Sequence, residues 1–373
     1  MKKIRVLMIV DNLNKCDGIA SYVMNYYKKF NLEKFQIDVL VSKSDNGVYD
    51  EYKDTIENLG GKVILRHNIK NSDIVKEIKN IKKFFEENKY DIVHSHIINV
   101  GYFYLKYARL SGVKIRILHS HSTYLWSKNI FNYIRNLIFT FLAKYNANYN
   151  FACSKLAGEA LFGKKQFTII KNAINLEKYK FNNEIREKYR KDLNIENNVV
   201  YGHIGRFNVQ KNHIFLLKVF EEINRDNKNS KLLLIGKGEL QKEIQEEIKK
   251  RKLENSVIIL GEREDVNNLL QAIDIFLLPS LFEGLPIVGI EAQAAGLPCY
   301  FSNTITDEVR ILETSKFIDI DNLDKWRNTI LKNKNKRLEN NDVKENMVNA
   351  GYDINKEVKV LEKIYEEMIM GNN

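Results

Sequence analysis

The chain has 373 residues, enough for two domains, and 44% of them are hydrophobic, so each half can bury its own core. Its formal charge is +11, but the basic residues are spread through Lys/Glu/Asn-rich stretches, with no arginine-rich tract and no zinc-finger spacing. This distribution argues against nucleic acid as a partner and leaves an anionic membrane or a phosphorylated ligand open.

Cysteine usage and hydropathy indicate a cytoplasmic protein. Cys16, Cys153 and Cys299 lie far apart and are odd in number, which argues against a disulfide framework. The segment Met1–Val10 is interpreted as a first strand rather than a signal peptide, because its apolar core is short and no small-residue cleavage site follows. No apolar run reaches the roughly 18 residues of a membrane span.

Short Val/Ile/Leu runs alternate with amphipathic stretches along the chain, and this order predicts two parallel-sheet α/β domains. The strands expected in the first half are Ile4–Val10, Phe35–Val41, Lys62–Leu65, Asp91–His94, Lys114–His119, Tyr149–Ala152 and Thr168–Ile170. Those expected in the second half are Val199–Ile204, Lys231–Ile235, Ser256–Leu260, Asp274–Leu278, Cys299–Ser302 and Lys316–Ile318.

A polar, charged segment, Lys171–Glu196, separates the two sets of strands, and we place the linker there. We expect an N-terminal domain over residues 1–172 and a C-terminal domain over residues 173–354. The last stretch, residues 355–373, has the pattern of a helix with one apolar face and is expected to return to the N-terminal domain.

All three prolines fall within residues 279–298 or at its edge, in a chain otherwise free of proline. The apolar run Ile273–Leu278 suits a strand buried on both faces. Pro286 then fits the first position of a helix, where a missing N–H has no consequence, and Gly296 fits the position just past its end. This concentration of prolines, with Gly296, predicts a segment whose turns have a defined shape, as a binding site requires.

Two glutamates stand in this window. Glu283, with Gly284, is expected in the turn that faces the helix N-terminus, and Glu291 within the helix. Free backbone N–H groups and the helix dipole favour an anion at that end, and a carboxylate beside it can accept two hydrogen bonds from sugar hydroxyls. The plainer alternative is an ordinary strand–turn–helix with solvated glutamates.

Other polar residues of the second half follow strands at the same predicted sheet edge. Arg206 and Lys211 flank the loop after the strand Val199–Ile204, and two cations at this separation can straddle a diphosphate and stabilise it as a leaving group. Gly236 and Arg263 lie in turns after the next two strands. The alternative is two ordinary surface cations in a basic chain.

In the first half, Gly18 follows the first strand, where a glycine lets the backbone approach a phosphate or sugar closely. There is no G-x-G-x-x-G, so a dinucleotide fingerprint is absent. His119 and His121 end the fifth strand and could bond a substrate hydroxyl or stabilise charge. We expect His94 and His96 to cap strand and helix ends, and we expect no metal, because no Cys or Asp/Glu cluster completes a ligand set.

Taken in chain order, these residues resemble glycosyltransferase family 4. That resemblance implies the GT-B fold, in which two Rossmann-like domains face each other across a cleft. It covers almost the whole chain, and it is strongest in the second half, at Glu283-x7-Glu291 and at Gly205-Arg206 with Gln210–His213. In the first half it rests on Asp17-Gly18-Ile19 and on Arg116–Ser122, which is similar to the subgroup that builds bacterial capsular and exopolysaccharides.

The resemblance implies a role for each residue in the second half. Arg206 and Lys211 would bind the donor diphosphate, and Glu291 the ribose hydroxyls of the nucleotide. Glu283 would contact the donor sugar near the reacting carbon, helped by the backbone of Gly284 and Leu285 and by the helix that begins at Pro286. Gly236 and Arg263 complete the expected donor site.

In the first half, Gly18 would lie close to the phosphates or to the acceptor. One of His119 and His121 would touch the sugar at the reaction centre, and we prefer His121. Two departures from the family's pattern stand out: Asp17 where a glycine is frequent, and Lys171-Asn172-Ala173 where Pro-Asn-Gly is frequent.

The family implies retaining transfer without metal or other cofactor. The donor would be a nucleotide sugar, expected to be UDP-linked, and the group moved a hexose or N-acetylhexosamine. The acceptor would be a saccharide or lipid-linked saccharide in surface polysaccharide synthesis. A UDP-sugar epimerase or hydrolase on the same frame, and a non-catalytic sugar- or nucleotide-binding protein, remain alternatives.

The aromatic, basic stretch Asn129–Tyr145 has two interpretations. Its apolar residues could pack in the core, which we favour, or rest on an anionic membrane surface. The second interpretation would make the protein cytoplasmic with peripheral attachment at the inner face of the membrane.

Overall fold

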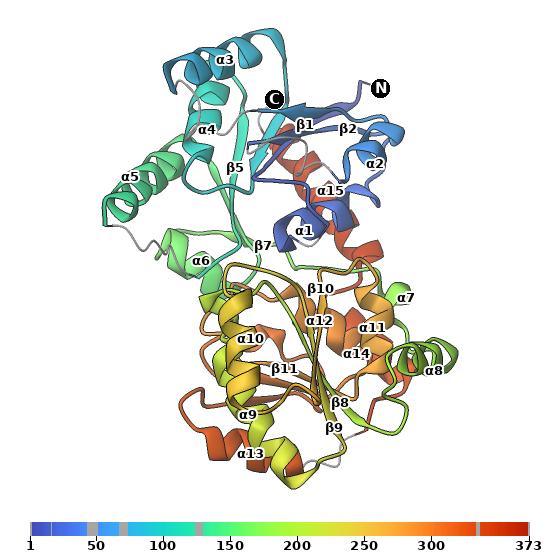
Figure 1. Cartoon of the computed structure of the whole chain (residues 1–373). Coiled ribbons are helices and arrows are strands. Elements are labelled where there is room, and N and C mark those ends of the chain that lie inside the picture. Colours follow the sequence, from blue (N-terminus) through green and yellow to red (C-terminus); the bar gives the residue numbers. More distant parts are fainter. Residues whose placement is uncertain are drawn as a thin grey trace. The chain divides into compact units, whose positions relative to one another are not determined.

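The computed structural model describes residues 2–15, 17–42, 51–66, 74–123, 130–332 and 336–371. It divides the chain into two compact units. Unit 1 is Met1–Ala173 with Ile354–Asn373, and unit 2 is Ile174–Asp353. Each unit contains one parallel sheet with helices against it (Figure 1). The predicted α/β class, with two parallel-sheet domains, is confirmed.

The sheet of unit 1 has seven strands in the order β3-β2-β1-β4-β5-β6-β7, and every neighbouring pair is parallel. The strands are β1 Ile4–Val10, β2 Phe35–Val41, β3 Val63–Leu65, β4 Ile92–Ser95, β5 Ile115–Ser120, β6 Tyr149–Ala152 and β7 Thr168–Ile169. The chain moves outward from β1 in one direction, then returns to β4 on its other side. Between β1 and β4 lies a topological switch point, where open α/β sheets bind ligands.

The helices of unit 1 are α1 Gly18–Tyr27, α2 Lys53–Asn58, α3 Ile74–Glu87, α4 Gly101–Leu110, α5 Ile130–Asn146, α6 Lys155–Phe162 and α15 Ile354–Gly371. One core forms where α3 and α4 pack on β1, β4 and β5. The helices α1 and α15 lie on the other side of the sheet (Figure 1). The predicted return of the C-terminal helix to the first domain is confirmed, and it buries Val358, Leu361 and Tyr365 there.

Helix α5 does not bury its apolar face, so our preferred interpretation of it as a core helix is wrong. Phe131 is 79% exposed, Phe141 67% and Ile130 62%. Only Thr140, Ala143 and Asn146 of this helix are buried, because the contact with α4 uses the opposite stripe. Over the described residues, no helix combines the length and apolarity that a membrane crossing requires.

The sheet of unit 2 has six parallel strands in the order β10-β9-β8-β11-β12-β13. The strands are β8 Val199–Ile204, β9 Ser230–Ile235, β10 Val257–Gly261, β11 Ile275–Leu278, β12 Cys299–Ser302 and β13 Lys316–Ile318. Its switch point lies between β8 and β11.

The helices of unit 2 are α7 Leu176–Tyr179, α8 Asn183–Asp192, α9 His213–Asp226, α10 Gln241–Lys250, α11 Val266–Ala272, α12 Ile287–Ala294, α13 Leu323–Lys332 and α14 Asn340–Asn349, with short 3₁₀ turns η1 Val209–Lys211 and η2 Asp307–Val309. Helices α9, α10 and α13 enclose the main core on one face of the sheet. Helices α8, α11, α12 and α14 lie on the other side (Figure 1).

The segment expected to be a linker instead contains α7 and α8, which belong to unit 2. Its charged composition has a structural use. Arg186 and Arg190 both pair with Asp274 at the start of β11, with shortest distances of 2.5 and 3.3 Å. The Asp274 carboxylate also accepts a bond from the backbone N–H of Val200, so α8 is fastened to the sheet.

The proline-marked window folds as a strand, turn and helix, with one shift of register. Helix α12 begins at Ile287, so Pro286 is its N-cap residue rather than its first helical residue. At the other end Gly296 has φ of +76°. Its N–H bonds Gln293 O and the N–H of Leu297 bonds Ala292 O, the two hydrogen bonds of a Schellman motif.

Candidate functional site

The centre of the candidate site is an ion pair at the switch point of unit 2. Lys211 follows β8 and Glu283 follows β11, and Lys211 Nζ lies 2.6 Å from Glu283 Oε1. The side chains are only 13% and 10% exposed. Gln210 completes the group, because its Nε2 donates to Glu283 Oε2 at 3.0 Å and to Phe282 O at 3.0 Å. The loops after two neighbouring strands are thus joined into one rigid polar surface.

The loop that carries Lys211 is shaped by two asparagines. The side chain of Asn208 accepts a hydrogen bond from the N–H of Lys211 at 3.1 Å and caps the turn η1. Asn212 adopts φ of +53°, a left-handed conformation that asparagine tolerates better than most residues, and α9 begins directly after it. The backbone of Leu281 donates to Gln210 O at 2.8 Å, which ties this loop to the proline window.

Glycines in these loops are required by the protein's own packing. A Cβ at Gly205 would lie 2.9 Å from Lys211 Cε, so the glycine lets the lysine side chain cross the backbone. A Cβ at Gly236 would lie 2.1 Å from Gly205 O, and Gly236 has φ of +136°. The need for glycine at these two positions is therefore explained by contacts within the protein itself, and it does not depend on a ligand.

Helix α12 presents an open N-terminus beside this ion pair. Within the described chain, no side chain caps it, and its N-cap is Pro286. Glu283, Gly284 and Leu285 are buried in the turn that leads into it. The backbone N–H groups of the first turn carry partial positive charge and favour an anion.

Glu291 lies one turn further along α12 and has a partner that the sequence did not suggest. The hydroxyl of Tyr179, on α7, donates to Glu291 Oε1 at 2.5 Å. Burial raises the pKa of the Glu291 carboxyl, and this bond opposes that shift. Tyr179 is separated from Glu291 by more than 100 residues and no local pattern connects them, so sequence reasoning missed it.

The two arginines expected at this site have other partners in the structure. Arg206 makes an exposed ion pair with Glu239 at 3.4 Å, a contact of little energetic weight. Arg263 donates from Nε and Nη2 to the two oxygens of Asp265, at 2.8 and 2.7 Å. Lys211 and Glu283 are brought together, whereas Arg206 contacts Glu239 and Arg263 contacts Asp265. Their donor-binding roles stay predictions.

In unit 1 the turn after β1 is closed by Asp17. Its Oδ1 accepts hydrogen bonds from the N–H groups of Ile19 and Ala20, at 2.9 and 3.0 Å, and caps α1. Gly18 is the first residue of α1, and a Cβ there would have no heavy atom within 4 Å. Space is present at Gly18, but a carboxylate already satisfies the N–H groups that a phosphate would use.

Four histidines form a stack at the carboxyl edge of the unit 1 sheet. His94 and His96 come from β4 and the loop after it, and His119 and His121 from β5 and the loop after it. His94 Nε2 lies 3.0 Å from His119 Nδ1, and His96 Nδ1 lies 2.9 Å from His121 Nε2. The two bonded pairs stack on each other, with centroids 4.2 Å apart for His94 and His96 and 4.1 Å for His119 and His121.

This arrangement corrects the expectation that His94 and His96 cap strand and helix ends. Parallel neighbouring strands place residues i and i+2 on one face, so His-x-His at the ends of β4 and β5 brings all four rings together. The signal was present in the sequence as two His-x-His pairs. Only the strand order could show that the pairs are neighbours.

Burial keeps the stack uncharged. It lowers the pKa of His94 and of His121 to about 3, and it holds the pKa of His96 and His119 well below the ordinary value. Nitrogens of His94, His96 and His119 lie within 4.8 Å of one another, close enough to raise the question of a metal ion. Both nitrogens of His94 are already hydrogen-bonded, however, and coordination through it would break one of these bonds. That no metal is needed stays our prediction.

Exposure distinguishes the two histidines proposed for the reaction centre. His119 is fully buried, whereas His121 is partly exposed at the end of the strand. A ligand at this edge can reach His121 directly, and the Nε2 of His121 is held by His96.

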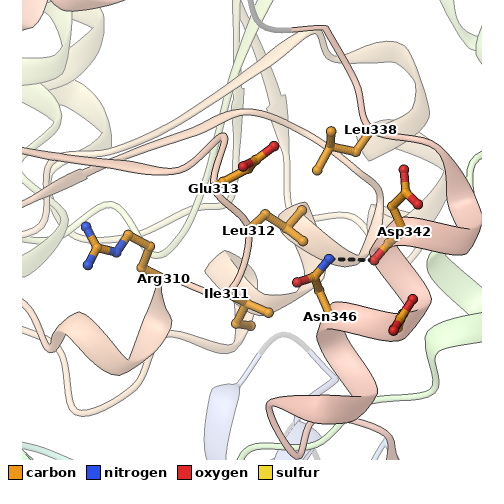
Figure 2. Close-up of a pocket in the computed structure, with 8 residues that line it drawn as sticks. Arg310, Ile311, Leu312, Glu313, Leu338, Asp342 and Asn346 are labelled. Carbon is orange, nitrogen blue, oxygen red and sulfur yellow. Dashed lines mark hydrogen bonds between the residues drawn. The ribbon is translucent and has the colours of Figure 1, made fainter.

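One pocket in the described part of unit 2 lies away from these residues. Its volume is about 500 Å³, and Figure 2 shows Leu312, Leu338 and Asn346 around it. The second pocket has about 470 Å³ and is lined by Arg186, Asp274 and Arg337 among others. Neither is lined by a residue predicted for the donor site.

Comparison with known proteins assigns the class. Residues 16–178 match the family described as Glycosyltransferase Family 4, and residues 185–351 match Glycosyl transferases group 1. The chain is 33% identical to the putative glycosyltransferase EpsF of Bacillus subtilis, over 97% of this chain and 96% of that protein. The chain belongs to glycosyltransferase family 4.

Two further proteins are informative. The chain is 25% identical to the Escherichia coli UDP-Gal:α-D-GlcNAc-diphosphoundecaprenol α-1,3-galactosyltransferase, over 95% of this chain and 94% of that one. Its fold is similar to that of HepE from Anabaena, solved in complex with UDP and glucose, with a TM-score of 0.80 at 16% identity over 98% of this chain and 100% of that one. The fold is GT-B, and the protein is a glycosyltransferase, as the sequence predicted.

Proposed function

We propose that the protein is a retaining glycosyltransferase that moves a hexose or N-acetylhexosamine from a UDP-sugar to a saccharide or lipid-linked saccharide acceptor in surface polysaccharide synthesis. The observation that carries this proposal is the Lys211–Glu283 pair at the switch point of unit 2, beside the open N-terminus of α12. A cation and free N–H groups suit a diphosphate, and a nearby carboxylate suits sugar hydroxyls.

In the proposed reaction, the bond between the anomeric carbon and the diphosphate oxygen breaks, and its electron pair goes to the leaving nucleoside diphosphate. The acceptor hydroxyl oxygen forms the new bond on the same face, and its proton passes to the departing phosphate. Lys211, Arg206 and the α12 N-terminus stabilise the charge that develops on the phosphate, and such preorganised donors act where charge appears. Neither step requires a metal.

The remaining residues orient the two substrates. Glu283, with the backbone of Gly284 and Leu285, would hold the donor sugar, and Glu291 the ribose. His121 would touch the sugar at the reaction centre. Gly18 was expected near the phosphates or the acceptor, and the Asp17 carboxylate at the start of α1 favours the sugar hydroxyls of the acceptor, which carry no charge.

Support for the donor and acceptor classes comes from proteins similar to this one. HepE was solved with UDP and glucose, and the name of the E. coli relative gives UDP-Gal as donor and a diphosphoundecaprenol-linked sugar as acceptor. An undecaprenol-linked acceptor resides in a membrane, so an enzyme that uses one must reach the membrane surface.

We propose that α5 rests on the anionic inner face of the membrane. Its exposed face carries Phe131, Phe141, Ile130, Ile138 and Tyr145. Helices α4 and α5 together contain four basic residues and no acidic ones, which complements an anionic surface. Peripheral attachment of a cytoplasmic enzyme follows from this proposal.

Sedimentation with vesicles tests the attachment. The wild type should bind vesicles of mixed neutral and anionic lipid at low salt, and the double variant Phe131→Ser/Phe141→Ser should lose most of that binding. Val75→Ser, which removes a 57% exposed apolar side chain from α3, serves as the matched control and should bind as the wild type does. Equal binding by the wild type and the double variant would refute the proposal.

Product analysis tests the reaction. The protein is incubated with a panel of UDP-sugars, with and without a lipid-diphosphate-linked acceptor sugar and with and without EDTA. We expect transfer only with acceptor, EDTA resistance, and a new glycosidic bond with the donor's anomeric configuration by NMR. Free sugar or an epimerised donor without acceptor would indicate a hydrolase or an epimerase instead, and UDP binding without any product a binding protein.

A further inference from the structure

The histidine stack of unit 1 continues into the C-terminal helix. His94 Nδ1 lies 2.6 Å from the hydroxyl of Tyr365 on α15, and His94 Nε2 lies 3.0 Å from His119 Nδ1. The rings of His94 and His119 are within 7° of parallel, and their centroids are 5.2 Å apart. At this distance the two rings lie edge to edge along the hydrogen bond rather than face to face. A chain of hydrogen bonds therefore runs from Tyr365 through His94 to His119.

Each of the three groups is buried, so none exchanges its partner for bulk water. Tyr365, His94 and His119 are all fully buried. Burial raises the pKa of the Tyr365 hydroxyl and lowers the pKa of both imidazoles, so the chain is neutral at physiological pH. A neutral imidazole has one N–H and one bare nitrogen, which leaves two possible directions for the chain.

The direction can be decided by counting unpaired groups. Among the described residues, His94 Nδ1 is the hydrogen-bond partner of the Tyr365 hydroxyl, and His119 Nε2 has no partner. If Tyr365 donates, His94 donates from Nε2 to His119, and only the His119 Nε2–H is left unpaired. If Tyr365 accepts, its own proton and the bare Nε2 of His119 are both left unpaired. Each direction leaves one donor unpaired, and the second direction also leaves an acceptor unpaired. One additional buried, unpaired group costs about 1–3 kcal/mol, so the first direction is favoured.

We propose that Tyr365 and His94 are positioning residues that hold His119 in the tautomer with its proton on Nε2. His119 Nε2 then carries a proton and cannot act as a general base, and it stays enclosed beneath the edge of the sheet. Because no substrate atom reaches this nitrogen, His119 acts on the site only through its contact with His121. This role rests on the proposed function, because it assumes that the edge binds a sugar substrate.

His119 influences the proposed reaction centre through its ring contacts in the stack. The ring of His119 lies face to face with that of His121 at 4.1 Å, and Tyr22 from α1 packs edge-on against both, at 5.3 and 5.0 Å. The orientation of His119 therefore supports that of His121, the partly exposed residue that we place against the sugar. In this way Tyr365, on α15, influences a site built on β4 and β5.

The test measures the tautomer directly. Protein labelled with ¹⁵N in its histidines is examined by NMR correlation of ring nitrogens with ring protons, and the His119 signals are assigned from a His119→Gln sample. In the wild type we expect His119 protonated at Nε2 in at least about five molecules of six, the ratio that follows from the lower limit of about 1 kcal/mol. A wild type with the His119 proton on Nδ1, or with a charged ring, would overturn the proposal.

The variant Tyr365→Phe sharpens the result. Without the hydroxyl, both directions leave the same number of unpaired groups, so we expect both tautomers in comparable amounts. Tyr27→Phe is the matched control, because it also removes a buried tyrosine hydroxyl of unit 1 that is hydrogen-bonded, here to Ile37 O at 3.1 Å. It should keep the wild-type tautomer. An unchanged tautomer in Tyr365→Phe would also overturn the proposal.

Activity adds a second readout. If half of the molecules lose the correct tautomer, kcat should fall about twofold with the KM for the donor unchanged. The NMR arm needs no turnover. A wild type that shows the Nε2–H tautomer but transfers no sugar would therefore count against the proposed function and leave the tautomer assignment standing.

Discussion

The carboxyl edges of the two sheets share a topology but differ in charge. In both sheets the strand order turns at a switch point, between β1 and β4 in unit 1 and between β8 and β11 in unit 2. The edge in unit 1 carries uncharged imidazoles and a helix N-terminus closed by Asp17. The edge in unit 2 carries Lys211 and a helix N-terminus without a side-chain cap. This difference supports our proposal that unit 2 receives the anionic diphosphate of the donor, whereas unit 1 receives the uncharged hydroxyl groups of the acceptor sugar.

Among the changes that test this comparison, removal of the buried cation of unit 2 should have the largest effect on transfer activity. Lys211→Ala takes away a positive charge beside the proposed diphosphate and removes the cation that is paired with the buried Glu283 carboxylate. We expect transfer activity to fall by at least about 100-fold, the range seen when one preorganised donor is lost. Initial rates at saturating donor measure this.

The matched control for that variant is Arg225→Ala. Arg225 is a 62% exposed cation of unit 2 that is paired with Glu222 within α9. It should keep activity within about twofold, because exposed pairs contribute little. Equal losses in the two variants would mean that net charge matters and the Lys211 site does not.

Acid should act on unit 1 through its histidines. Their folded-state pKa values lie below the ordinary 6.5, at about 3 for His94 and His121, so the unfolded state binds more protons as the pH falls. Stability is therefore full above pH 6.5 and is lost as the pH falls toward the folded values, by up to about 1.4 kcal/mol per pH unit for each such histidine. Denaturant titrations from pH 7 to pH 5 measure the slope. His121→Gln should reduce it, and an unchanged slope would contradict the assignment of His121 as a neutral group in the folded protein.

A substitution can give the N-terminus of α12 the kind of side-chain cap that α1 has. Pro286→Asp would give α12 the carboxylate cap that α1 has, and the backbone of residue 286, with φ of −70° and ψ of 109°, suits an N-cap. Stability should not fall, but UDP affinity should drop about tenfold, because the new carboxylate would occupy the N–H groups and repel the diphosphate. Calorimetric titration with UDP measures it. Pro286→Ala is the control without added charge, and the comparison fails if both variants bind UDP equally.

The reverse change in unit 1 should have the smallest effect. Asp17→Asn keeps an oxygen for the cap and removes the charge, so the stability of α1 should change by less than about 0.5 kcal/mol. UDP affinity should change by less than about twofold. A fivefold or larger gain in UDP affinity would show that α1 also receives the diphosphate.

The sequence predicts the fold well where one segment carries the whole signal. All thirteen observed strands lie at or within two residues of a predicted one, since short runs of branched apolar residues between turns rarely have another meaning. Gly296 was correctly placed past the end of α12, because a positive φ at that position favours glycine. Helix α5 was misjudged because an apolar helix face has the same pattern whether protein, membrane or solvent lies against it.

The site was predictable in its residues but not in its connections. Lys211 and Glu283 were named from the chain, yet their ion pair depends on β8 and β11 being neighbours, which local sequence does not state. The partners Tyr179 and Tyr365 were missed for the same reason, since each meets its target from a distant segment. Asp17 was recognised as a departure from the family pattern, but its use as a cap became visible only through its hydrogen bonds.

Amide hydrogen exchange in the presence of UDP tests the central claim most directly. If the diphosphate binds unit 2, peptides that cover residues 205–212 and 281–292 should become protected, and the peptide that covers α1 should exchange at an unchanged rate. Protection of α1 without protection of the α12 N-terminus would contradict the account.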